Sequence, residues 1–137
     1  MPVDTYKTSF GVRTIAYRGD GLYVKSERIY IQCVNQHSGL GASGMAFNVR
    51  AAERQLEHLH DLGVNAVRMA YDPPDPELLR LTDRMGFLVM DEVFDSGERK
   101  KTDNDFQLIF PEWYEADLRS LIRRDRNHLH IRLEHWQ

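Results

Sequence analysis

Apolar and polar positions along the chain predict three strands, each followed by a helix. Short, mainly apolar runs occupy residues 29–34, 65–70 and 87–90, which is the pattern expected for buried strands. After each run, apolar side chains recur at helical spacing. These side chains are Val49, Ala52, Leu56 and Leu59, then Leu78, Leu81 and Met85, and finally Tyr114, Leu118, Leu121 and Ile122. Strand and helix therefore alternate three times.

The ends of the predicted helices carry residues that suit helix termini. Asn48 stands where a capping side chain is expected, and Asp75 precedes a proline at the start of the second helix. Gly63 and Gly86 follow the first two helices, where a left-handed residue often ends a helix. Pro111 begins the third helix. These positions set the predicted helix boundaries.

Alternation of strands and helices predicts right-handed crossovers and a parallel sheet, so the predicted fold class is α/β. Such a sheet is either open and doubly wound or part of a (β/α)8 barrel, and periodicity alone does not choose between them. Neither Gly-x-Gly-x-x-Gly after the first strand nor Gly-x-x-x-x-Gly-Lys occurs, so a nucleotide-binding sheet lacks its strongest cue. Residues 129–133 are a possible fourth strand.

The beginning of the chain does not follow this alternation. Residues 10–17 read as a single β-strand, and we interpret residues 1–20 as the end of a preceding β domain and its linker. Residues 21–137 are then the N-terminal part of the α/β domain.

Composition is that of an ordinary soluble globular protein. Of the 137 residues, 42% are hydrophobic and 28% are charged, and the formal net charge is −3. The basic cluster Arg119–Arg126 also contains Asp125 and is explained by a solvated helix face, so no nucleic-acid partner is expected. No segment suggests a signal peptide or membrane span, and Cys33, expected in the core, has no second cysteine to pair with. We therefore expect a cytoplasmic protein without a membrane partner.

Polar side chains follow or interrupt each predicted strand, at the edge where parallel α/β folds place their sites. They are Asn35 and His37 after the first strand, Arg68 in the second, and Asp91 and Glu92 after the third. Their hydrogen-bonding groups suit a polar, neutral ligand such as a sugar. Since a buried charge is rarely left alone, Arg68 should pair with Asp91 or Glu92, which should point to opposite faces.

Each of these features also has a purely structural explanation. His37 could anchor a surface loop, and an ion pair of Arg68 could serve stability alone. The six histidines do not indicate a metal site, because His58 and His60 are two residues apart and do not share a helix face. No motif of a catalytic nucleophile occurs, and neither a metal nor a cofactor is expected.

Six short motifs follow one another along the chain. They are Phe10-Gly-Val-Arg13, Asp20-Gly-Leu-Tyr23, Val34-Asn-Gln-His37, Asn65-Ala-Val-Arg68, Asp83-Arg-Met-Gly86 and Met90-Asp-Glu92. In their order and spacing over residues 10–128, they resemble glycoside hydrolase family 2, which includes β-galactosidases, β-glucuronidases and β-mannosidases. The chain departs from the family pattern at Tyr71, where a histidine is usual, at Gly97, where close relatives carry tryptophan, and at Cys33, which replaces a glycine.

The resemblance implies a partial (β/α)8 barrel of about three βα units that follows β-sandwich domains. It implies that His37 and Arg68 line the sugar-binding subsite and that Asp91 and Glu92 lie beside it. The expected ligand is a β-galactoside or a related sugar.

Family members hydrolyse glycosides with retention, through two glutamates whose carboxyl groups lie about 5 Å apart. By the resemblance, the acid/base glutamate follows the segment that matches Arg126-Asn127-His128, and the nucleophile comes later. The chain ends before both positions, and Glu134 falls too early to be a substitute. We therefore predict no catalytic residue and no hydrolase activity for this chain alone.

Three hypotheses remain open. The chain is an inactive fragment of a glycosidase, one part of an enzyme completed by another chain, or a non-catalytic sugar-binding or interaction module. A partial barrel leaves strand edges open, so self-association or a complementing barrel chain is expected.

Overall fold

The computed structural model describes residues 3–128 and 130–131, and the chain forms two compact units, residues 1–30 and 31–137. The first unit contains a three-stranded antiparallel sheet of β1 (Ile15–Arg18), β2 (Gly21–Val24) and β3 (Glu27–Ile29). A two-residue turn joins β2 to β3, and both of its residues, Lys25 and Ser26, have positive φ (51° and 68°). This is the backbone that a type I′ hairpin turn requires.

The predicted strand over residues 10–17 is wrong in its first half. Pairing with β2 begins only at Ile15, which lies opposite Val24. Val24 is the last residue of β2, so the residues before Ile15 have no β2 residue opposite them. The sheet also continues past the predicted boundary at residue 20 and ends in β3. That residues 1–20 derive from a β-sandwich domain stays a prediction.

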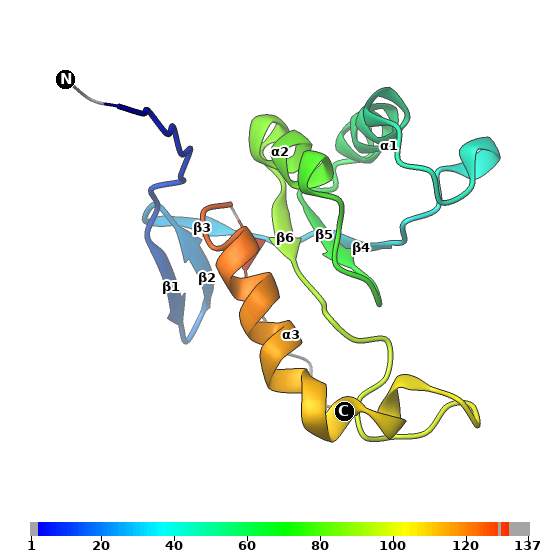
Figure 1. Ribbon diagram of the computed structural model, residues 1–137. Coiled ribbons are helices and arrows are strands. Elements are labelled where there is room, and N and C mark those ends of the chain that lie inside the picture. Colours follow the sequence, from blue (N-terminus) through cyan, green and yellow to red (C-terminus); the bar gives the residue numbers. More distant parts are fainter. Residues whose placement is uncertain (1–2, 129, 132–137) are drawn as a thin grey trace. The chain divides into compact units, whose positions relative to one another are not determined.

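The second unit contains four parallel strands that lie in chain order, β4-β5-β6-β7, with a helix after each of the first three (Figure 1). The strands are β4 (Cys33–Gln36), β5 (Ala66–Met69), β6 (Leu88–Met90) and β7 (His130–Ile131), and the helices are α1 (Val49–Asp61), α2 (Pro76–Met85) and α3 (Phe110–Asp125). Two short 3-10 helices, η1 (Gly41–Ser43) and η2 (Phe106–Leu108), lie in the connections. The predicted alternation and parallel pairing are confirmed. The described strand order does not reverse, as it would in a doubly wound sheet.

The first and last predicted strands differ from the structure in their bounds. Ile29 belongs to the antiparallel sheet, and the parallel sheet begins at Cys33, so the apolar run over residues 29–34 spans two sheets. A possible fourth strand over residues 129–133 is confirmed where it is described, as His130–Ile131 beside β6. The other residues of that range lie outside the described part of the chain.

The predicted helix caps are confirmed. The side-chain oxygens of Asn48 and Asp75 accept backbone N–H groups in the first turns of α1 and α2, at 3.0 and 2.8 Å. Gly86 ends α2 with a left-handed φ of 79°. Helix α3 begins at Phe110, one residue before the predicted start at Pro111. Proline is tolerated throughout the first turn of a helix, so its presence does not fix the first residue.

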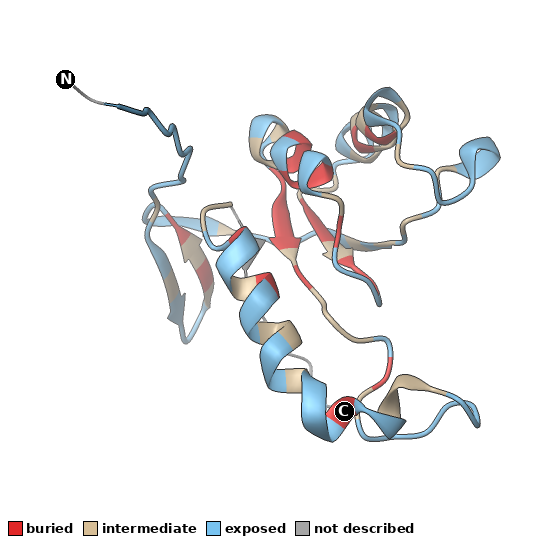
Figure 2. Ribbon diagram, viewed as in Figure 1, coloured by how far each residue is buried: buried red, intermediate tan, exposed pale blue. Residues whose placement is uncertain are grey.

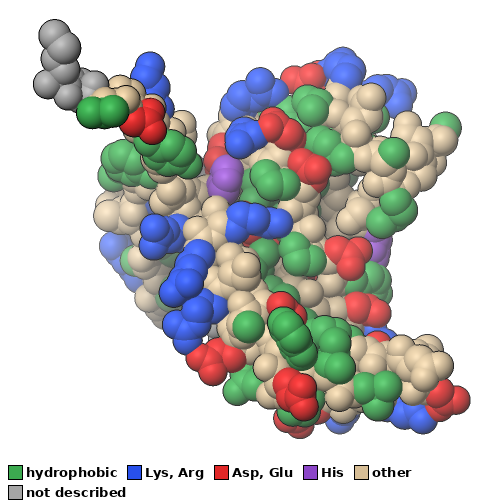
Figure 3. Space-filling view, viewed as in Figure 1, with side chains coloured by type: hydrophobic (Ala, Val, Ile, Leu, Met, Phe, Trp, Pro, Cys, Tyr) green, Lys and Arg blue, Asp and Glu red, His purple; other side chains and the backbone are tan. Residues whose placement is uncertain are grey.

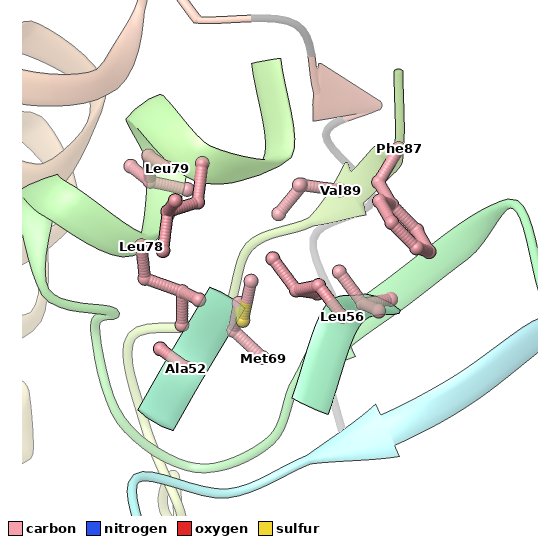
Figure 4. Close-up of a cluster of buried hydrophobic side chains, with 9 residues drawn as sticks. Ala52, Leu56, Met69, Leu78, Leu79, Phe87 and Val89 are labelled. Atoms are coloured by element: carbon pink, nitrogen blue, oxygen red, sulfur yellow. The ribbon is translucent and has the colours of Figure 1, made fainter. Parts of the chain in front are cut away.

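An apolar core lies between the strands and the first two helices (Figure 4). Its buried members are Ala52, Leu56, Val67, Met69, Leu78, Leu79, Leu81, Phe87 and Val89. Figure 2 shows the same concentration of buried residues on β5, β6 and α2. Burial of this apolar surface is the main force that holds the strand–helix units together.

The two faces of the parallel sheet have different chemistry because side chains alternate along each strand. Val34, Val67 and Met69 belong to the core, so Asn35 and Arg68 point away from it. The same alternation explains why Cys33 is exposed, although it was expected in the core.

Charged side chains of both signs are spread over the face of the molecule drawn in Figure 3. Among the described helices, none combines the length and the apolar character needed to cross a membrane.

We predict that Leu56→Ala lowers the free energy of unfolding by about 2–5 kcal/mol, because it removes a fully buried side chain and leaves a cavity. Urea unfolding followed by circular dichroism would measure the change. The matched control is Leu62→Ala, since the Leu62 side chain is 79% exposed, and it should change stability far less. Equal effects would contradict the described core.

Candidate functional site

An ion pair stands at the carboxyl end of the parallel sheet. Arg68, near the end of β5, donates from Nη2 to Glu92 Oε1 at 2.6 Å. Their side chains are only 24% and 15% exposed, so water screens the pair weakly. The Arg68 Nη1 group also donates to Asn35 Oδ1 of β4 at 3.4 Å. The prediction that Arg68 pairs with Asp91 or Glu92 is confirmed, and the partner is Glu92.

Glu92 also fixes the loop after β5. Its second oxygen, Oε2, accepts the backbone N–H of Tyr71 at 3.0 Å. Tyr71 has a φ of 79°, a left-handed conformation that is rare for a bulky side chain. The Glu92 carboxylate, which follows β6, thus binds both the guanidinium of Arg68 and the strained turn at Tyr71.

Asp91 directly precedes Glu92 in the chain. Its side chain is buried, and its negative charge acts on Arg124 of α3. The hydrogen bonds to Asp125 are the largest cause of the raised pKa of Arg124, and the charge of Asp91 adds to them. Arg124 also donates to the Pro74 carbonyl at 3.0 Å. The charge of Asp91 thus acts on α3, whereas Glu92 binds Arg68 of β5. That the two side chains point to opposite faces stays a prediction.

His37 is exposed and follows β4 directly. Its ring centroid lies 4.9 Å from that of Tyr71, with the two planes tilted by 43°. The ammonium group of Lys101 lies 5.1 Å from the Tyr71 ring centroid. The structure thus places four of the five predicted residues, Asn35, His37, Arg68 and Glu92, in one region centred on Arg68 and Tyr71.

Tyr71 and Lys101 were not among the predicted site residues. The position of Tyr71 after the second strand, and its departure from the family pattern, could have identified it. Lys101 lies in a polar loop whose sequence has no periodic pattern, so nothing local marks it. Its ammonium donates to the carbonyl oxygen and to Oδ1 of Asp95, both at 2.7 Å, and the side-chain bond raises the pKa of Lys101.

The loop that carries Lys101 is held in place by Asp105. This carboxylate accepts bonds from the Phe106 N–H at 2.7 Å, Ser96 Oγ at 2.9 Å and the Lys101 N–H at 3.0 Å. The ring of Phe106 stacks on Phe94 at a centroid distance of 5.5 Å. The polar loop therefore has a defined shape beside Tyr71.

Two cavities open at this edge of the sheet. One of about 540 Å³ includes His37 in its lining, and one of about 430 Å³ includes Tyr71. Both include Asp72, Pro73 and Arg124, and neither includes Asn35, Arg68 or Glu92. These volumes lie within the range of small-molecule sites. Among the described residues, no three His, Cys, Asp or Glu side chains are grouped closely enough to hold a metal ion.

We predict that Glu92→Ala lowers the free energy of unfolding by about 1–3 kcal/mol, because Arg68 and the Tyr71 N–H lose their shared acceptor. Urea titration would measure the loss. Glu57→Ala is the control: Glu57 also pairs with an arginine, Arg50, but that pair is exposed, so its loss should matter much less. A comparable loss in both variants would argue against a special role of Glu92.

We predict that the Asp105 carboxyl titrates below its ordinary pKa of 3.8, chiefly because the Phe106 N–H donates to its ionised form. A carboxyl group with a lowered pKa in the folded state stabilises the loop above about pH 4, and this contribution is lost as the pH falls through the lowered value. The amide NMR signals of Phe106 and Lys101 should report this titration. A midpoint at or above 3.8 would contradict the described bonds.

Comparisons with known proteins agree on the family of this chain. The family model described as glycosyl hydrolases family 2, TIM barrel domain, matches residues 15–133. The beta-galactosidase BoGH2A of Bacteroides ovatus is 46% identical over 127 residues, which cover 92% of this chain and 15% of that protein. A putative beta-glucuronidase of Formosa agariphila is 34% identical over 127 residues, or 92% of this chain and 12% of the relative.

The solved structures agree with the sequences. A family 2 glycosyl hydrolase from Bacteroides cellulosilyticus superimposes with a TM-score of 0.84 at 33% identity, over 89% of this chain and 16% of that structure. In sequence, the chain spans only about 15% of the length of its relative BoGH2A. Since the family model covers most of the chain and the site residues lie within the matched range, the chain belongs to glycosyl hydrolase family 2.

Proposed function

We propose that these residues form the N-terminal part of the (β/α)8 barrel of a family 2 β-glycosidase and carry one wall of its sugar-binding subsite. The observation that supports this most directly is the polar group at the carboxyl end of the sheet, where Arg68 is held by Asn35 and Glu92. Barrel enzymes bind their substrates at this end. The unreversed order of the four described strands is that of a barrel wall.

The arrangement suits a ligand rich in hydroxyl groups. Arg68 has further N–H donors besides those that contact Asn35 and Glu92, and a guanidinium has no acceptor of its own. His37 is exposed, contacts the Tyr71 ring, and can donate or accept through its ring nitrogens. Sugar hydroxyls, which do both, match this mixture of donors and acceptors.

Charge favours a neutral sugar over a uronic acid. Each of three cations in this region lies within ion-pair distance of a carboxylate: Arg68–Glu92, Lys101–Asp95 and Arg124–Asp125. Asp72 and Asp117 line the smaller cavity in addition. A uronate carboxylate would meet net negative charge here, and like-charge contacts weaken binding. We therefore propose a β-galactoside or another neutral β-pyranoside as the substrate class.

The described carboxylates do not form a hydrolytic pair. Both carboxylate oxygens of Glu92 are already engaged, Oε1 by Arg68 and Oε2 by the Tyr71 N–H. Asp91 is buried, and its charge acts on Arg124. We propose that this chain binds sugar without cleaving it and that hydrolysis requires carboxylates from further residues or a complementing chain.

The sheet edge is the basis for a partner. In the described part of the sheet, β4 pairs with β5 on one side only. Exposed strand edges associate readily with other strands. We propose that β4 pairs with a strand of the rest of the barrel, supplied by the same polypeptide, a complementing chain or a second copy.

We predict that the 137-residue chain binds methyl β-galactoside more tightly than methyl β-glucuronide, as measured by chemical-shift titration. His37→Ala should weaken galactoside binding by about 3- to 10-fold, the effect of losing one hydrogen bond. His58→Ala, a change of an exposed histidine on α1, should leave binding unchanged.

Three outcomes would each contradict part of the proposal. Absence of binding to any sugar by the folded chain would remove the sugar-binding role. Glucuronide binding as tight as galactoside binding would remove the preference for a neutral ligand. Turnover of a chromogenic galactoside, lost in Glu134→Gln, would overturn the proposed lack of catalysis.

A further inference from the structure

Asp83 of α2 and His128, which follows α3, form a contact that the proposed function does not use. The Nδ1 atom of His128 lies 2.6 Å from Asp83 Oδ2. A carboxylate oxygen only accepts, so the ring nitrogen is the donor. The side chains of His128 and Asp83 are 20% and 31% exposed, so solvent competes only in part for this bond. One hydrogen bond thus joins two segments that lie 45 residues apart in the chain.

The place of His128 is fixed from two sides. Its backbone N–H donates at 2.9 Å to the carbonyl oxygen of Asp125, the last residue of α3. Asp125 is itself fully buried and accepts two bonds of 2.7 Å from the Arg124 guanidinium. The backbone of His128 is therefore tied to the end of α3, while its ring is tied to α2.

The strand that follows His128 has little else in the described chain to set its register. Strand β7 begins only two residues later, and two residues span at most about 7 Å, so the position of His128 limits where β7 can start. The described ladder between β6 and β7 has two pairs, Val89 with His130 and Met90 with Ile131. A shift of this short ladder by one residue would turn every side chain of β7 to the opposite face of the sheet.

We propose that Asp83 and His128 are positioning residues, whose hydrogen bond is a latch that sets the register of β7 against β6. This inference rests on the proposed function, in which the strands of a barrel wall end at the ligand-binding edge. Strand β7 is parallel to β6, and Glu92 follows β6, so the carboxyl end of β7 points to the same edge as Glu92. The latch lies where the two strands begin and thereby decides which side chains of the fourth strand turn toward the ligand.

Hydrogen exchange followed by mass spectrometry on the 137-residue chain tests the latch. Asp83→Ala should speed the exchange of the β7 amides by about 10-fold, the effect of losing one hydrogen bond to a charged group, and leave β5 at its wild-type rate. Adding His128→Ala should speed β7 no further, because both changes remove the same bond. The matched control is Arg84→Ala, at the next residue of α2, whose side chain is 66% exposed; it should leave β7 unchanged.

Nuclear magnetic resonance gives a second measurement, which begins with the wild-type chain. The ring signals of His128 should show a proton on Nδ1, and backbone contacts should pair Val89 with His130. In the milder variant Asp83→Asn, the contacts between Val89 and His130 should weaken, while those between Val67 and Val89 persist.

Three results would overturn the latch: an Nδ1 without a proton, an unchanged β7 in Asp83→Ala, or an equal acceleration of β5 and β7. None of them would affect sugar binding at Arg68. Absence of sugar binding by the folded wild-type chain would instead overturn the proposed function and leave the measured register of β7 as it is.

Discussion

The Arg68–Glu92 ion pair is the interaction on which the polar edge of this protein depends. It is formed by residues from the second and third strand units, and Arg68 also reaches Asn35 in the first. Without a carboxylate at residue 92, a guanidinium with little exposure would be left with one long hydrogen bond, which is costly. The same carboxylate fixes the Tyr71 turn. A single anion thus joins the residue after β6 to Arg68 of β5 and to the turn that follows β5.

The division of the sheet into two faces explains how one small domain carries both a core and a site. Along β5, Val67 and Met69 pack into the apolar cluster while Arg68 between them faces away. Side-chain alternation in strands makes this separation automatic. The described helices α1 and α2 cover the apolar face, and the polar side chains gather on the other face at the carboxyl edge.

Elements that depend on nearby residues could be predicted from the sequence, and those that depend on distant partners could not. Asn48, Asp75 and Gly86 end their helices as expected because capping involves only the adjacent turn. The apolar run over residues 29–34 gave no sign that its first part pairs with β2, since pairing is a long-range property. Arg68 and its carboxylate were predictable from the cost of a buried charge. The contacts of Tyr71 and Lys101 arise from the fold of separate loops.

The order of the strands has a consequence for how the domain is made. Each of β5, β6 and β7 pairs with the strand that precedes it in the chain, and a helix connects the two strands of each pair. During synthesis, every new unit therefore finds its neighbour already outside the ribosome. Domains commonly form from the N-terminal side during translation. This sheet can grow one unit at a time on the nascent chain, with its newest strand as the template for the next.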